Sequence, residues 1–186
     1  MADVMTATRT TRTIAVNDAC RLATRADMMY AADHRWWWHH DWCQWFKGER
    51  WTQNRGPQGW VDEASSKGLE IVNCNHSLEL SRDQSAVSSG WNSAFQALNL
   101  AVLQGASRIL LLGLDLRDDH GAHFFGDHPP GLQKRSPYAT FIKAFMSAAP
   151  VLAEMGVEVI NCSQTSALHC YPKMSVEDAI SKRTIA

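Results

Sequence analysis

The sequence predicts an α/β domain with a Rossmann-like, mainly parallel sheet and helices on both faces. Its strand candidates are short continuous apolar runs, which are typical of strands covered on both faces. Helical patterns separate the later runs, so strand and helix alternate, as in parallel sheets with right-handed crossovers. The 186 residues fit a single domain over 1–186 with a sizeable core. We expect residues 1–12 and 175–186 to be peripheral or flexible.

Five segments fit buried strands: Thr13–Asn17, Asp27–Asp33, Leu69–Asn75, Arg108–Leu116 and Val157–Cys162. Two others have helical spacing. Asn92–Gln104 would end at Gly105, and Tyr138–Met155 would begin after Pro137. Pro150 lies inside the second helix and is expected to kink or split it.

Composition and charge exclude several classes of protein. The chain is 45% hydrophobic and 20% charged with a net charge of −1, so it is globular and shows no clear nucleic-acid footprint. No apolar run approaches the length of a membrane span, and the N-terminal residues lack the apolar core of a signal peptide. The five cysteines are an odd number without paired short spacing, which indicates free thiols. We therefore expect a cytoplasmic protein.

Polar residues follow four of the strand candidates: Asn17 and Asp18, Asp33, Asn73 and Asn75, and Asp115. Each alone is explained more simply as a helix cap or a turn residue. Ligands of parallel sheets, however, bind beyond the carboxyl ends of the strands. The coincidence of four polar strand ends therefore favours a ligand site there.

Two further segments contain residues that could bind a ligand or take part in catalysis. Ser88–Ser93 leads into a helix, where exposed amides and hydroxyls suit a phosphate, although Ser89 or Asn92 could simply cap the helix. The long connection Asp115–Ser136 contains His120, His123, Asp127 and His128. For these side chains we rank general acid–base chemistry first, a solvated loop second and metal binding third, because their spacing matches no established metal motif. No metal ligand is assigned.

Most of the eight tryptophans fall in Trp36–Trp51. They could form a stacking surface for a sugar or a base, fill the core, or make a homo-oligomer interface. Trp36, Trp37 and Trp38 cannot all face one side of a helix, so we expect at least one of them to point outward. No glycine-rich dinucleotide fingerprint or P-loop occurs, so NAD(P) and ATP have no support.

Several short motifs occur in a fixed order: Val16–Ala19, Tyr30–Asp33, Asn92–Ala94 with Gln96–Ala97, Leu112–Asp115, His123–His128, and Asn161–Cys162 with Ser166–Leu168. In this order, over Thr13–Leu168, the chain resembles a family of Rossmann-like proteins of phages and prophages. That family is similar to the small bacterial CMP-sialic-acid sialyltransferases and, distantly, to the 6-hydroxymethylpterin pyrophosphokinase-like family. The resemblance places the protein in a bacterium or in a phage-infected host cell.

The resemblance implies roles for particular residues. Asn17, Ser93, Gly113 and Asp115 would contact the nucleotide, and His128 would be the general base toward the acceptor hydroxyl, with His123 matching the first histidine of the family's motif. With the polar residues Asp18, Asp33 and Asn92, these form the expected site. The chain also departs from the family. The first strand with its Gly-x-Gly-Pro-Ser-Leu phosphate loop is expected to be missing, and the site's arginine and tyrosines have no obvious counterparts.

Three functions follow as hypotheses. The first is a nucleotide-dependent transferase, most simply a sialyltransferase-like glycosyltransferase that uses a CMP-type nucleotide or nucleotide-sugar donor. The alternative is a non-catalytic nucleotide-binding or phage assembly protein that associates through the tryptophan-rich region Trp36–Trp51. The third is a metal-dependent hydrolase centred on the histidines. Fold analogy alone does not decide among them.

Overall fold

The computed structural model describes residues 9–117 and 136–182. The strands are β1 (Ile14–Val16), β2 (Met28–Tyr30), β3 (Glu49–Gln53), β4 (Glu70–Asn75), β5 (Ala86–Ser88), β6 (Arg108–Leu111) and β7 (Glu158–Asn161). The α-helices are α2 (His34–His39), α3 (Trp60–Ser66), α4 (Ser93–Leu103), α5 (Tyr138–Glu154) and α6 (Val176–Ser181). Two 3₁₀ turns, η1 (Asn17–Arg21) and η2 (Asp41–Cys43), follow β1 and α2.

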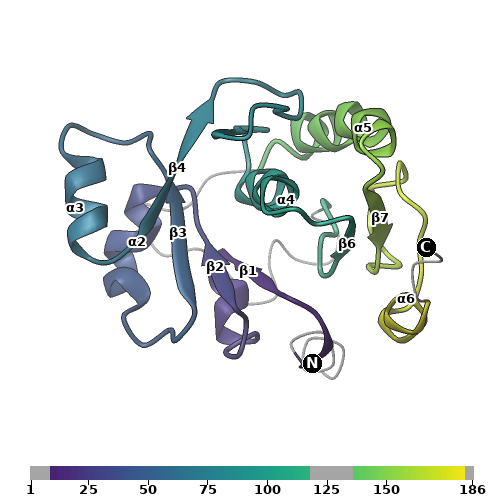
Figure 1. Cartoon of the computed structure of the whole chain (residues 1–186), viewed down its shortest axis with the longest axis horizontal. Coiled ribbons are helices and arrows are strands. Elements are labelled where there is room, and N and C mark those ends of the chain that lie inside the picture. The colour runs from purple at the N-terminus through teal and green to yellow at the C-terminus, as the bar shows by residue number, and fades with distance from the viewer. Residues whose placement is uncertain (1–8, 118–135, 183–186) are drawn as a thin grey trace.

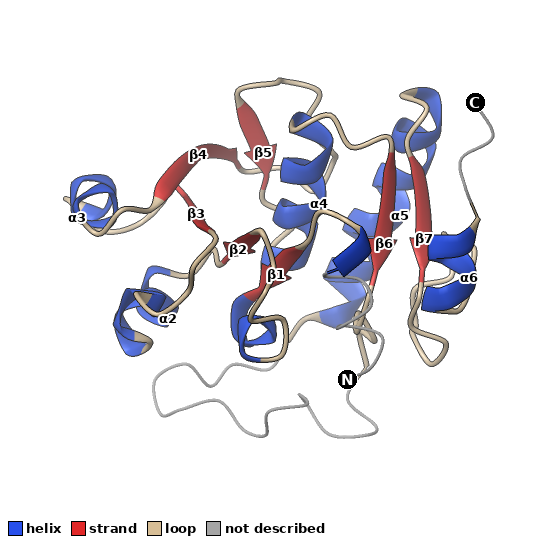
Figure 2. Cartoon of the chain, turned by 60° about the horizontal axis from the view of Figure 1, so that its bottom comes forward, coloured by secondary structure: helices blue, strands red, loops and turns tan. Residues whose placement is uncertain are grey.

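The sheet consists of two separate parts, visible as two groups of strands in Figure 2. Strands β1 to β5 pair in chain order, and β6 pairs with β7. Every strand pair is parallel, which confirms the predicted α/β, mainly parallel fold. Strand β4 curls the larger part, because its first half pairs with β3 and its second half with β5.

Helix α4 lies between the two parts of the sheet (Figure 1). On one side, Ala97 and Leu100 pack with Tyr30 and other residues of the five-stranded part. On the other side, Phe95 and Leu98 belong to a second cluster with α5, β6 and β7. The helix is therefore apolar on two opposite faces, and it joins two hydrophobic clusters into one structure.

A third cluster covers the other face of the five-stranded part, under α2 and α3 (Figure 1). Its large side chains are mostly aromatic, namely Trp36, Trp37, Trp42, Phe46 and Trp60. Three of the tryptophans that we considered for stacking, Trp36, Trp37 and Trp42, therefore fill the core. Trp38 is 44% exposed, which confirms that one of the three consecutive tryptophans points outward.

The strands and helices expected from apolar runs are present, but several are shorter than predicted: β6 ends at Leu111 and not at Leu116, and β2 covers only Met28–Tyr30 of Asp27–Asp33. The sequence pattern missed β3, because its residues Glu-Arg-Trp-Thr-Gln are mostly polar, and it missed β5, which has three residues. Helix α5 is not split at Pro150. Pro150 and Met146 lie on its exposed face, where the carbonyl that loses its amide partner can be hydrated.

Other expectations concern the chain as a whole. All five cysteines lie in the described residues, and none of them forms a disulfide. Within residues 9–117 and 136–182, none of the helices combines the length and the apolar character that crossing a membrane requires.

Candidate ligand site at the carboxyl edge of the sheet

Helix α4 begins beyond the carboxyl ends of the strands that surround it. The side chain of Asn92 accepts a hydrogen bond of 2.7 Å from the amide of Phe95, which confirms the capping role expected for this residue. The amides of Ser93 and Ala94 have no hydrogen-bond partner among the described residues. Free amides and the positive end of the helix dipole favour an anion at this position.

Ser93 connects the start of α4 to the ends of β2 and β3. The amide of Ala32, just after β2, donates to Oγ of Ser93 at 3.2 Å. The carbonyl of Ala32 in turn accepts from Nε2 of Gln53 at 2.9 Å, and the same Nε2 donates to the carbonyl of Arg55 at 2.7 Å. The buried Gln53 thus fixes the ends of two strands beside Ser93.

The loops after β3, β4 and β5 complete a ring around this helix start. The guanidinium of Arg55 contacts Nε2 of His76. The His76 ring lies against the Trp91 indole, with centroids 5.1 Å apart and planes inclined by 40°. Trp91 directly precedes the capping residue of α4, so these contacts form a closed ring from Ser93 back to the start of the helix. We call this set of residues the α4 rim: Ala32, Gln53, Arg55, His76, Trp91 and Ser93.

Asp33 follows Ala32 and is therefore close to the α4 rim, but its carboxylate is already engaged. It caps α2 by accepting from the amide of Arg35 at 3.0 Å and forms an ion pair with the Arg35 guanidinium at 2.5 Å. Partial burial would raise the pKa of Asp33, but the hydrogen bonds from Arg35 outweigh it and lower the pKa below its ordinary value. Its negative charge is thus balanced locally.

The residues after β1 are arranged differently. Asn17 has a left-handed backbone with φ of 50°, which asparagine tolerates better than most residues. Asp18 is buried, and its carboxylate accepts from Nε1 of Trp36 at 2.9 Å. Nε of Arg21 lies 3.3 Å from the same carboxylate, and Nε2 of His40 lies 3.6 Å from it. In this structure the Asp18 carboxylate therefore anchors the tryptophan cluster.

Gly113 and Asp115 belong to the end of β6, in the two-stranded part. Gly113 is exposed with φ of 68°, and Oδ1 of Asp115 accepts from the Thr165 hydroxyl at 3.0 Å. The carbonyl of Asp115 accepts from the amide of Ala167 at 2.8 Å, which ties this turn to the segment after β7. The expected catalytic residues His123 and His128, with His120 and Asp127, lie outside the described residues.

Sequence reasoning did not identify Gln53, Arg55, His76 or Trp91. Gln53 and Arg55 follow a strand that the hydrophobic pattern missed, so their place at the sheet edge was hidden. Trp91 could have been noticed, because it lies between Gly90 and the predicted cap Asn92. Among the described residues, no three histidine, cysteine or acidic side chains lie close enough to hold a metal ion.

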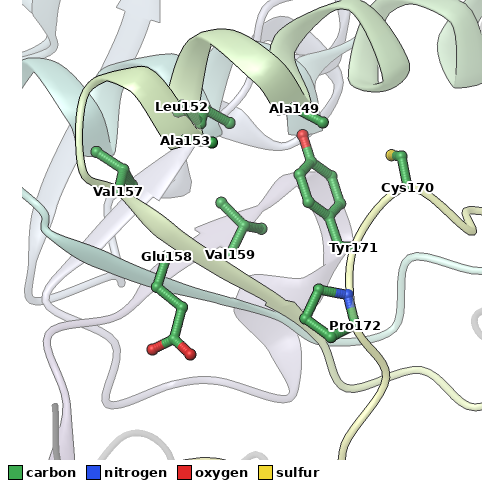
Figure 3. Close-up of a pocket in the computed structure, with 9 residues that line it drawn as sticks. All are labelled: Ala149, Leu152, Ala153, Val157, Glu158, Val159, Cys170, Tyr171 and Pro172. Atoms are coloured by element: carbon green, nitrogen blue, oxygen red, sulfur yellow. The ribbon is translucent and has the colours of Figure 1, made fainter. Parts of the chain in front are cut away.

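A pocket of about 240 Å³ lies elsewhere, between α5, β7 and the segment 170–172 (Figure 3). Its lining is apolar apart from Glu158, Cys170 and Tyr171. Glu158 pairs with Nε of Arg108 at 2.7 Å, and the Tyr171 hydroxyl donates to the carbonyl of Phe145 at 3.0 Å. Burial raises the pKa of Cys170 to about 11, so its thiol stays protonated near neutral pH. This pocket therefore presents few free polar or reactive groups to a ligand, and the α4 rim is the better candidate site.

No protein-family model matches the chain, and none of the curated proteins or solved structures matches it either.

Proposed function

We propose that the protein binds a nucleotide or a nucleotide-sugar at the α4 rim, with a phosphate at the amides of Ser93 and Ala94. We further propose that it acts as a nucleotide-dependent transferase, most simply a sialyltransferase-like glycosyltransferase. The observation that supports the binding site is the closed ring of contacts around the start of α4. Ligands of parallel sheets bind at this edge.

The charges near the α4 rim favour an anion. The start of α4 provides unpaired amides, and Arg55 has no carboxylate partner in the described part of the chain. Asp33, the acidic candidate next to Ala32 in the chain, is balanced by Arg35. A phosphate can therefore approach without meeting an uncompensated carboxylate from that residue.

For the transfer step, His128 is the proposed general base, with His123 as the second candidate. A base must remove the proton from the acceptor hydroxyl, while donors at the helix start stabilise the phosphate that leaves. A His128→Ala variant should keep nucleotide binding and lose transfer from a nucleotide-sugar to an acceptor. If this variant loses binding as well, His128 does not have the proposed role.

Binding is tested by thermal unfolding with CMP, UMP, AMP and GMP. At least one nucleotide should raise the melting temperature, because a ligand that binds only the folded state stabilises it. A Ser93→Asp variant should still fold, since an acidic side chain suits the first turn of a helix, but its charge should abolish the shift. Val61→Asp is the matched control, because it places the same charge in the first turn of α3. Absence of a shift with every nucleotide would contradict the proposal.

A second candidate is a non-catalytic assembly protein, and the exposed indoles favour it. Trp45 is 48% exposed, and large exposed aromatic side chains are common at protein interfaces. This function predicts an oligomer that a double variant, Trp38→Ser with Trp45→Ser, dissociates. Light scattering at several concentrations measures the oligomeric state of both proteins, and a monomer in the wild type would contradict this candidate.

A further inference from the structure

We propose that Trp91, supported by His76 and Arg55, is a stacking subsite for the planar base of a nucleotide whose phosphate lies at the start of α4. This inference rests on the function proposed above and adds the part of the ligand that is recognised and the side chain that recognises it. Aromatic side chains bind bases by stacking, because every base has a π-face.

The backbone of Trp91 is the first observation. Its φ is 57°, a left-handed conformation that costs a bulky residue about 1–2 kcal/mol relative to the right-handed one. The side chain is nevertheless 50% exposed, and its indole nitrogen has no hydrogen-bond partner among the described residues. Glycine would adopt this backbone without strain. Strain kept at an exposed aromatic residue points to a role in binding.

The loop holds the backbone of Trp91 in a defined conformation. The amide of Gly90 donates to the carbonyl of Ser77 at 2.9 Å, and the amide of Trp91 donates to Oγ of Ser89 at 3.2 Å. The side chain of Asn92 donates to the carbonyl of Gly90 at 2.8 Å. Because the loop backbone is already fixed, less conformational entropy is lost when a ligand binds.

The partners of Trp91 leave part of the ring open. His76 lies against it, and Arg55 donates to Nε2 of His76, which fixes the orientation of the imidazole. Half of the Trp91 surface remains exposed, and Trp91 directly precedes Asn92, the cap of α4. A ligand with both a phosphate and a planar ring can therefore occupy the helix start and the indole together.

Titration calorimetry with CMP and with ribose 5-phosphate, which lacks the base, tests the subsite. Wild-type protein should bind CMP about tenfold or more tightly than ribose 5-phosphate, the range expected for stacking of one base. Trp91→Gly should lower CMP affinity to that of ribose 5-phosphate and leave the latter unchanged. This variant should also fold well, because glycine relieves the strain. Trp91→Phe should retain most of the preference, and Arg55→Gln should weaken both ligands.

The control is Trp45→Ala, which removes an equally exposed indole far along the sequence and should change neither affinity. Equal binding of the two ligands by the wild type, or an unchanged CMP affinity in Trp91→Gly, would overturn the subsite and leave the proposed phosphate site standing. If neither ligand nor any other nucleotide binds, both the proposed function and the subsite are wrong.

Discussion

Asp18 and His40 are two titratable side chains that lie together within the aromatic cluster. The Asp18 carboxylate accepts from Trp36 and lies near Arg21 and His40. The His40 side chain is only 10% exposed and rests on the Trp36 ring, with centroids 4.3 Å apart. Its Nε2 has no hydrogen-bond partner among the described residues. Burial lowers the pKa of His40 below its ordinary value of 6.5, and Arg21 and His39 add to this against the opposing effect of Asp18.

This shift predicts a stability that falls with acid. Between pH 6.5 and the lower pKa of the folded state, the unfolded chain binds a proton at His40 that the folded chain does not. Stability is therefore fully present above pH 6.5 and falls below it, by up to about 1.4 kcal/mol per pH unit for this one group. Urea unfolding at pH 7.5 and pH 5.5 should show a smaller loss in His40→Gln than in the wild type. The same loss in both would show that His40 does not contribute.

At the scale of elements, the start of α4 is set by its close approach to the preceding loop. Gly90 has φ of 48°, and a Cβ placed on it would lie 2.1 Å from Cδ1 of Phe95. Phe95 cannot move away, since it is fully buried and packs edge-on against Phe145 at 5.4 Å. Helix and loop can therefore meet only at a glycine, and this contact positions Trp91 and Ser93.

Gly90→Ala should therefore destabilise the protein by about 2–4 kcal/mol, from a steric clash added to left-handed strain. Gly105→Ala, at the other end of α4, is the matched control. Its φ is 83°, but a Cβ there has no neighbour within 4 Å, so only the backbone strain of about 1–2 kcal/mol applies. Denaturant unfolding measures the stability loss of both variants, from the change in midpoint when the m-value stays constant. Equal losses would show that the contact with Phe95 is not tight.

At the scale of the whole molecule, the division of the sheet leaves two strand edges unpaired. The amide of Met28 donates a hydrogen bond to the carbonyl of Thr13, and the amide of Cys162 donates to the carbonyl of Leu111. The backbone groups of Thr13 and Leu111 therefore face the partner strands β2 and β7. The alternate residues, Ile14 and Val16 in β1 and Leu110 in β6, direct their amides to the other edge. None of these amides has a hydrogen-bond partner in the described part of the chain.

Amide hydrogen exchange should reveal these edges. The amides of Val16 and Leu110 should exchange much faster than those of Ala15 and Leu111, their chain neighbours, which face β2 and β7. The comparison is internal, because each pair lies in one strand. Equal protection would mean that something pairs with the open edges in solution. NMR detection is suitable, since it reports single residues.

The candidate site was only partly predictable. Asn92 and Asp33 could be recognised as helix caps, and Ser93 as the start of a helix, because these features depend on neighbours in the chain. Arg55 and His76 could not be placed, because their contact joins residues 21 positions apart through the pairing of polar β3 with β4. The catalytic roles of His123 and His128 remain predictions.

By itself, the sequence determined the class of fold. Continuous apolar runs and helical spacing depend on local periodicity, so the parallel strands, α4 and α5 followed from them. Only the tertiary structure decided that the sheet is divided, that four of the eight tryptophans fill the core, and that Trp91 lies beside the start of α4. Each of these depends on which distant segments pack together, because local periodicity specifies which face of an element is apolar but not the partner that covers it.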